Sequence, residues 1–121
     1  MPFEVIGREA GLVVIRIRGR LSCAEWETGQ RAAEPLVTAE QVQGLLVLTE
    51  AFEGWEPGEA WGSLEYVQLS DAHLSRIAIV GDPAWREDLL GFSLAGMRRA
   101  AVEFFTDEAQ ARAWLAGRIS G

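Results

Sequence analysis

The 121-residue chain has no lysine, a single cysteine and no long apolar run. One cysteine, Cys23, excludes an internal disulfide framework and suits a reducing compartment, so we expect a cytoplasmic protein. A helix that crosses a membrane needs roughly 18 or more apolar residues in succession, and no segment approaches that length. No basic segment followed by an apolar stretch opens the sequence, so no secretory signal is expected.

Positive charge is also scarce, since the 11 arginines are outnumbered by 18 acidic residues and the net charge is −7. Nucleic-acid binding needs a clustered basic surface, so we expect no nucleic-acid partner. Docking on anionic lipid depends on basic residues too, each contributing only about 1 kcal/mol. Any membrane contact is therefore expected to be weak, peripheral and driven by apolar surface.

Apolar residues make up 49% of the chain, which is enough for a sizeable core. At this length we expect one domain over residues 1–121. Residues 3–6 predict a short strand, and a five-residue turn over 7–11 predicts an antiparallel hairpin with the next strand. The later strands are expected at residues 12–18, 44–49, 76–81 and 101–105.

Each of these four later strands precedes a helical pattern, and this βα repeat indicates parallel strands joined by crossovers. The first helix starts at a capping box made by Ser22 and Glu25 and runs towards Leu36, with Pro35 kinking or ending it. The sequence therefore predicts an α/β fold: a mixed sheet of about five strands, the first antiparallel at the edge, and four main helices.

The other three helices have their own start signals. One begins at Pro57 and runs to about residue 69. The next has Asp82 as its N-cap and Pro83 at its first position. Thr106 is expected to cap the last.

The stretch of residues 44–66 holds the expected central strand, an aromatic and acidic loop, and the start of a helix. Ligands usually lie at the carboxyl edge of such sheets, where this loop leaves. Trp55 and Trp61 flank the loop and either form a recognition surface or fill the gap between helix and sheet. Glutamate recurs at every third residue of this stretch, at Glu50, Glu53, Glu56 and Glu59. This pattern favours a solvated acidic loop over a metal site.

The helix after Asp82 carries more apolar surface than a helix on a sheet needs. Trp85, Leu89 and Phe92 form one stripe. The remaining apolar residues form a second patch on roughly the opposite side: Leu90, Leu94 and Met97. Either one patch covers the sheet and the other faces a partner, ligand or lipid, or both are buried.

No catalytic set is present. Ser70, Asp71 and His73 have the residue types of a hydrolase triad, but triad members come from distant segments. Cys23 has no histidine within sequence reach, and Gly81 lacks the further glycines of a phosphate loop. We therefore expect a protein that is not an enzyme and has no metal, cofactor or catalytic residue.

Three segments resemble the SpoIIAA-like family, a branch of the bacterial STAS-type domains. They are residues 52–55, residues 76–82 with Trp85, and residues 102–105 with the helix that follows. Their order and spacing match over almost the whole chain. The resemblance implies a SpoIIAA-like βα superhelix.

The resemblance also implies a role without catalysis. Members of the family are proposed to take up apolar ligands between helices and to associate with membranes. STAS relatives antagonise anti-sigma factors and are switched by phosphorylation of a serine at the start of the helix after the central strand. Here residues 53–60 contain no Ser or Thr, and the nearest hydroxyl, on Ser63, lies further into the helix.

Two hypotheses follow. In the first, an apolar small molecule or lipid chain binds between the helices that start at Pro57 and Pro83. Its pocket would be lined by Trp55, Trp61, Leu64, Trp85, Leu89 and Phe92. In the second, the same surface is a protein-interaction module that binds a partner or a second copy of the chain, forming a homodimer.

Overall fold

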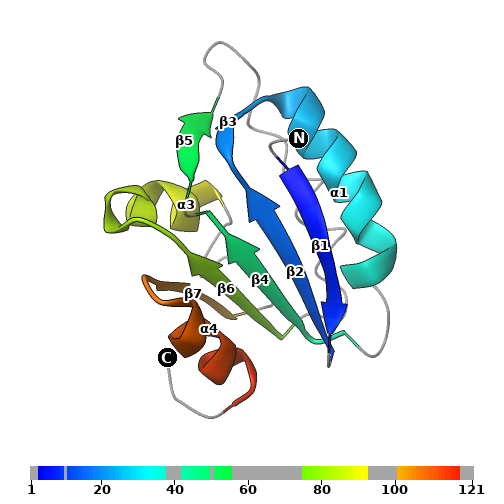
Figure 1. Cartoon of the computed structure of the whole chain (residues 1–121), viewed down its shortest axis with the longest axis vertical. Helices are drawn as coiled ribbons and strands as arrows, with labels where there is room; N and C mark the ends of the chain where they lie inside the picture. The colour runs from blue at the N-terminus through cyan, green and yellow to red at the C-terminus, as the bar shows by residue number, and fades with distance from the viewer. Residues whose placement is uncertain are drawn as a thin grey trace.

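The computed structural model describes residues 3–9, 11–37, 42–49, 51–55, 75–92 and 101–117. Five strands form one mixed sheet in the order β1-β2-β4-β6-β7 (Figure 1). They are β1 (Phe3–Glu9), β2 (Leu12–Ile17), β4 (Gly44–Leu48), β6 (Arg76–Val80) and β7 (Ala101–Phe105). β1 runs antiparallel to β2 at one edge, and the other neighbours are parallel. The predicted mixed α/β sheet with an antiparallel edge strand is confirmed.

The hairpin between β1 and β2 is tighter than the sequence predicts. β1 continues to Glu9, which pairs with Leu12, so the expected five-residue turn is wrong. The register shifts between Val5 and Gly7. This β-bulge accommodates one extra residue in the edge strand and lets the pairing continue.

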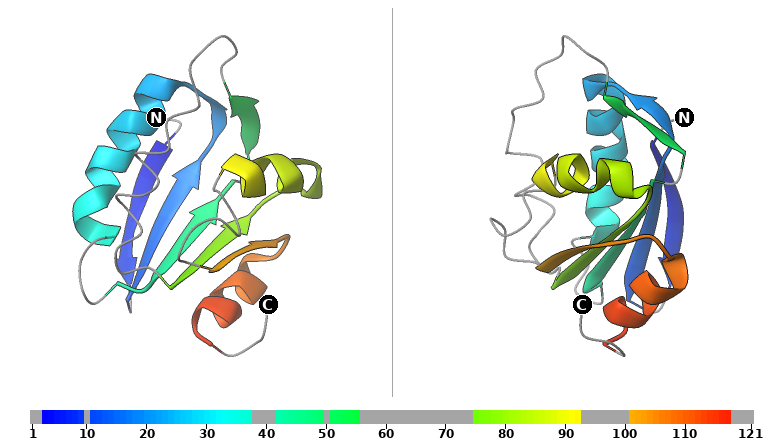
Figure 2. Two further views of the ribbon diagram at one scale, coloured as in Figure 1. Left: turned by 180° about the vertical axis from the view of Figure 1, so that it is seen from behind. Right: turned by 90° about the vertical axis from the view of Figure 1, so that its left-hand side faces the viewer.

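A second, two-stranded parallel sheet lies beyond the carboxyl ends of β2 and β4 (Figures 1 and 2). It pairs β3 (Gly19–Leu21) with β5 (Phe52–Trp55). The sequence predicts a loop at residues 52–55, and this prediction is wrong because these residues form β5. The chain turns at Gly19, whose φ is +63°, and the Gly19 N–H donates to the Ala51 carbonyl at 2.8 Å. That contact brings the two short segments alongside each other.

The first helix, α1 (Cys23–Val37), begins at the predicted capping box. The Glu25 N–H donates to Ser22 Oγ at 3.2 Å, and the Ser22 N–H donates to Glu25 Oε1 at 3.1 Å. The helix continues past Pro35 to Val37, so it does not end at the proline. A proline this close to the end removes only one backbone donor from the last turns.

Two further helix starts are resolved. The Asp82 carboxylate accepts the Ala84 N–H at 2.9 Å, which confirms the predicted N-cap. The chain then forms a 3-10 turn, η1 (Pro83–Trp85), which leads into α3 (Arg86–Phe92). Asp107, not Thr106, caps α4 (Glu108–Leu115), because its carboxylate accepts the Ala109 N–H at 2.8 Å. The described part therefore contains three α-helices and one 3-10 turn. The helix predicted from residue 57 to about residue 69 lies outside it.

Helices cover both faces of the main sheet (Figure 2). On the face of α1 and α3, the core contains Val13, Ile15, Ile17, Leu21, Val42, Val47, Phe52, Ile77, Ile79 and Leu89. On the face of α4, it contains Val14, Leu46, Leu48, Ala78, Val80, Ala111 and Trp114. Alternate residues of β2 enter opposite cores, as the pleat of a strand requires.

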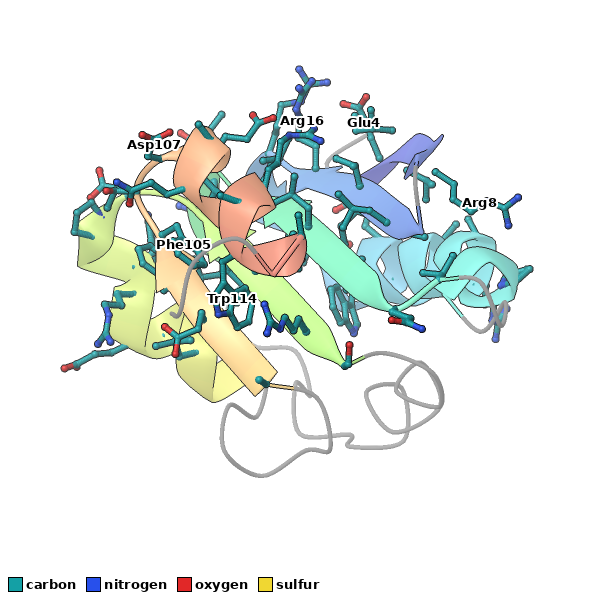
Figure 3. The ribbon with its side chains drawn as sticks, turned by 90° about the horizontal axis from the view of Figure 1, so that it is seen from below. Glu4, Arg8, Arg16, Phe105, Asp107 and Trp114 are labelled. Carbon is teal, nitrogen blue, oxygen red and sulfur yellow. The ribbon has the colours of Figure 1, made fainter. Side chains whose placement is uncertain are left out.

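Arg76 attaches α4 to the amino end of the sheet. Its guanidinium lies 5.2 Å from the centre of the Trp114 ring and donates to the Trp114 carbonyl, near the end of α4. The Trp114 ring in turn lies 5.6 Å from the Phe105 ring (Figure 3). A cation at a helix C-terminus also complements the helix dipole.

Candidate functional site

The carboxyl edge of the main sheet is the place where the fold brings distant segments together. Backbone hydrogen bonds continue past the strand ends: the Thr49 N–H donates to Val80 O at 2.8 Å, and the Gly81 N–H donates to Phe105 O at 3.1 Å. The small β3–β5 sheet and η1 follow directly. In α/β sheets this edge is the usual position of a binding site.

One side of this edge is held by a steric fit between Thr49 and Gly81. The Thr49 side chain is 1% exposed, and its hydroxyl donates to Val80 O at 2.8 Å. A Cβ on Gly81 would lie only 2.2 Å from Thr49 Oγ1. The missing side chain at Gly81 thus makes room for the buried hydroxyl, and it fixes the backbone just before Asp82.

A second contact joins β5 to η1. The Trp85 ring is half-buried and meets the Phe52 ring edge-on, with centroids 5.2 Å apart and an interplanar angle of 61°. Gly54 has a φ of +118°, and a Cβ there would lie 3.2 Å from Trp85 Cη2. The backbone of β5 therefore rests on the indole, where a larger residue would not fit without movement.

The predicted lining residues have different positions. Leu89 is 5% exposed and belongs to the core on the α1 and α3 face. Trp85 and Leu90, both half-buried, pack against the same core, so Leu89 and Leu90 do not lie on opposite sides of the helix. The remaining predicted residues and side chains lie outside the described part: Trp61, Leu64, Leu94, Met97 and the side chains of Trp55 and Phe92.

Exposed carboxylates surround the edge. Asp82 and Asp107 each accept a backbone N–H at a helix start, which accounts for their position. Glu53 is exposed, while Glu50, Glu56 and Glu59 lie outside the described residues. Among the described residues, no group of three His, Cys, Asp or Glu side chains could hold a metal ion.

Other sequence candidates fall outside what the structure describes. These are Ser70, Asp71, His73 and the side chain of Cys23. No helix in the described ranges combines the length and the apolar character needed to span a membrane. The sequence alone does not reveal the Thr49–Gly81 fit, because the two residues follow different strands and each has an ordinary sequence context.

Several known structures share this fold. A protein with a SpoIIAA-like fold from Shewanella loihica is 18% identical, with a TM-score of 0.67, covering 93% of this chain and 91% of that one. The anti-sigma factor antagonist SpoIIAA in its unphosphorylated form is 16% identical, with a TM-score of 0.64, covering 95% and 98%. The Bacillus cell fate determinant SpoIIAA in the phosphorylated form is 16% identical, with a TM-score of 0.59, covering 93% and 98%.

Identities this low show a common fold and no more. No curated protein sequence matches the chain significantly. The family model described as SpoIIAA-like, however, matches residues 12–116, which include every described strand and helix except β1. The chain therefore belongs to the SpoIIAA-like family.

Proposed function

We propose that the protein is a non-catalytic regulatory domain that binds a partner protein at the carboxyl edge of its sheet. The observation that carries this proposal is the SpoIIAA-like family match over residues 12–116. One structural relative, SpoIIAA, is an anti-sigma factor antagonist, and a protein-binding role for this chain is carried over from it as a proposal. The rigid attachment of β5 to η1 supports the choice of surface, because a preorganised site loses less entropy on binding.

This domain works without the phosphorylation switch that the STAS resemblance implies. Residues 53–60, which follow the start of β5, contain no Ser or Thr. Thr49, the hydroxyl residue at the end of β4, is 1% exposed and its hydroxyl is engaged with Val80 O. A kinase cannot reach such a group without local unfolding. Occupancy of the edge by the partner, and not phosphorylation there, sets the regulatory state.

Site-specific photo-crosslinking tests this proposal. A photoreactive residue is placed at Glu53 or Ala84, both exposed at the carboxyl edge, in cells that produce the protein. The matched controls carry the same residue at Gln43 or Ser75, exposed at the amino edge. We expect one dominant crosslinked protein from the first pair and not from the second. Identical products from both edges, or none from Glu53 and Ala84, would contradict the proposal.

A second candidate function, binding of an apolar small molecule or lipid chain, is favoured by the half-buried Trp85 and its contact with Phe52. The proposed lining is Trp55, Trp61, Leu64, Trp85, Leu89 and Phe92. Because Leu89 is 5% exposed, it would form the floor of such a pocket.

The dependence of binding affinity on the length of a fatty acid tests this second candidate. A buried methylene contributes about 0.8 kcal/mol, and association alone costs at least about 4 kcal/mol. Affinity should therefore rise steeply from short to long fatty acids, with a change in tryptophan fluorescence. Native mass spectrometry of the protein purified from cells would show a carried ligand and also a homodimer. A protein without bound mass and without a response to chain length would rule this candidate out.

A further inference from the structure

The face of the sheet that carries α4 is only partly covered by a described helix. α4 packs against β4, β6 and β7. The β1–β2 side of this face instead presents charged residues, and Figure 3 shows Glu4 and Arg16 pointing away from the sheet on the side of α4. Charged side chains are stable there only because water, or a partner, reaches them.

Three arginines lie two residues apart in the sequence, Arg16 in β2, Arg18 between β2 and β3, and Arg20 in β3, and we call them the arginine row. They alternate with apolar residues that are buried in the core on the opposite face: Ile15, Ile17 and Leu21. Arg18 has a side chain that is 50% exposed, Arg20 is exposed and Arg16 is half-buried. Two residues of extended chain span about 7 Å, so Arg16 and Arg18 match the spacing of alternate side chains in a second extended segment, whereas Arg20 follows the change of direction at Gly19.

Carboxylate groups of the chain itself lie beside these arginines. Glu4 forms an ion pair with Arg18. Glu53 Oε2 lies 3.7 Å from the position of a Cβ on Gly19, between the second and third arginines. Arg16 lies opposite Glu4 in the β1–β2 register but forms no ion pair within the described part of the chain. Arg18 therefore binds a carboxylate of the chain itself, and Arg16 lies two residues before it.

We propose that Arg16 and Arg18 of the arginine row bind an acidic segment of a partner protein, held in an extended conformation with carboxylates two residues apart. Arginine suits this role because its planar guanidinium can hold a carboxylate through two parallel hydrogen bonds. The existing pair with Glu4 is solvent-exposed, so exchanging it for a partner's carboxylate costs little. Arg16 and Arg18 lie on a face of the main sheet, whereas the proposed function uses its carboxyl edge, so the two proposals are tested separately.

Fluorescence anisotropy with a labelled seven-residue peptide of alternating aspartate and threonine tests the proposal. The test variant combines Arg16→Glu and Arg18→Glu. The control combines Arg8→Glu and Arg86→Glu, which change the net charge equally at exposed positions outside the row. Exposed ion pairs contribute up to about fivefold each, so we expect an affinity loss of about tenfold or more in the test variant. The control should lose less than about threefold, and binding of the parent protein should weaken as salt is added.

Circular dichroism establishes that each variant is folded, and a variant with Arg16→Gln and Arg18→Gln replaces the first if it is not. Equal losses in test and control variants would overturn the proposal, because the effect would then reflect net charge alone. Tighter binding of a single-stranded oligonucleotide of the same charge would also overturn it. That result would identify a nucleic-acid surface instead.

Discussion

Replacing Gly81 by alanine tests whether the carboxyl edge depends on one steric fit. The added methyl carbon would lie 2.2 Å from Thr49 Oγ1 and 3.5 Å from Thr49 Cβ. Thr49 cannot rotate away freely, since it is 1% exposed and its hydroxyl donates to Val80 O. Gly81 is not among the glycines with positive φ, so alanine adds a steric cost and no backbone strain.

The expected magnitude follows from these contacts. Overpacking a buried site costs about 1–3 kcal/mol, and displacing the Thr49 hydroxyl sacrifices a buried hydrogen bond of about 1 kcal/mol. Gly81→Ala should therefore lower the free energy of unfolding by about 2–4 kcal/mol. Thr49→Ala alone should cost about 1–2 kcal/mol. With both changes the methyl fits, so the double variant should be nearly as stable as Thr49→Ala alone.

Urea denaturation of the four proteins, followed by circular dichroism, measures this cycle. The two changes should show a favourable coupling of about 2–4 kcal/mol, which is the cost of Gly81→Ala that the double variant avoids. Gly44→Ala is the matched control, because a Cβ there meets the ends of the Leu12 and Leu115 side chains at 3.3 Å and the Arg76 carbonyl oxygen at an ordinary 3.9 Å. Those ends can move, so the control should lose less than about 1 kcal/mol. If the stability loss of the double variant equals the sum of the two single losses within about 0.5 kcal/mol, the reasoning is refuted.

Three further outcomes are expected. Leu89→Asp should unfold the domain, seen by circular dichroism, because Leu89 is 5% exposed in the core and an unpaired buried carboxylate is costly. A folded variant that merely loses a ligand response would contradict this and favour the pocket. Arg76→Ala should lower the free energy of unfolding by about 1–2 kcal/mol, because it removes the contacts with Trp114. Arg76→Lys should recover only part of the lost stability, because lysine keeps the charge but not the planar guanidinium. Vesicle binding, measured by co-sedimentation, should be weak and nearly insensitive to salt at a net charge of −7, and strong salt-sensitive binding would be the contrary result.

The sequence predicts the main sheet well because its signals are local. The strands β4 and β6 are short apolar runs, and the capping box of Ser22 and Glu25 starts α1 as expected. The small β3–β5 sheet was not predictable in the same way. Its strands have three and four residues, and their pairing depends on the change of direction at Gly19. Patterns in short segments do not carry that information.

The candidate site shows a similar division. The apolar stripe with Trp85 and Leu89 is visible at helical spacing, but spacing cannot tell which side of a helix meets the sheet. In the structure Leu89 and its neighbour Leu90 both pack on one core, since consecutive residues of a helix point only about 100° apart. The contact between Trp85 of η1 and Phe52 of β5 joins separate parts of the chain, so no local pattern reveals it.

The two contacts at the carboxyl edge hold β5 and η1 as one unit. Thr49 and Gly81 fix the backbone where the strands end, and the ring of Trp85 supports β5 at Gly54. A partner bound to β5, as proposed, would meet a surface that η1 supports, and changes at either contact would then disturb binding and stability together. Only an exposed side chain can affect one without the other. Glu53 is exposed and meets this condition, so it is a candidate determinant of specificity for the proposed partner.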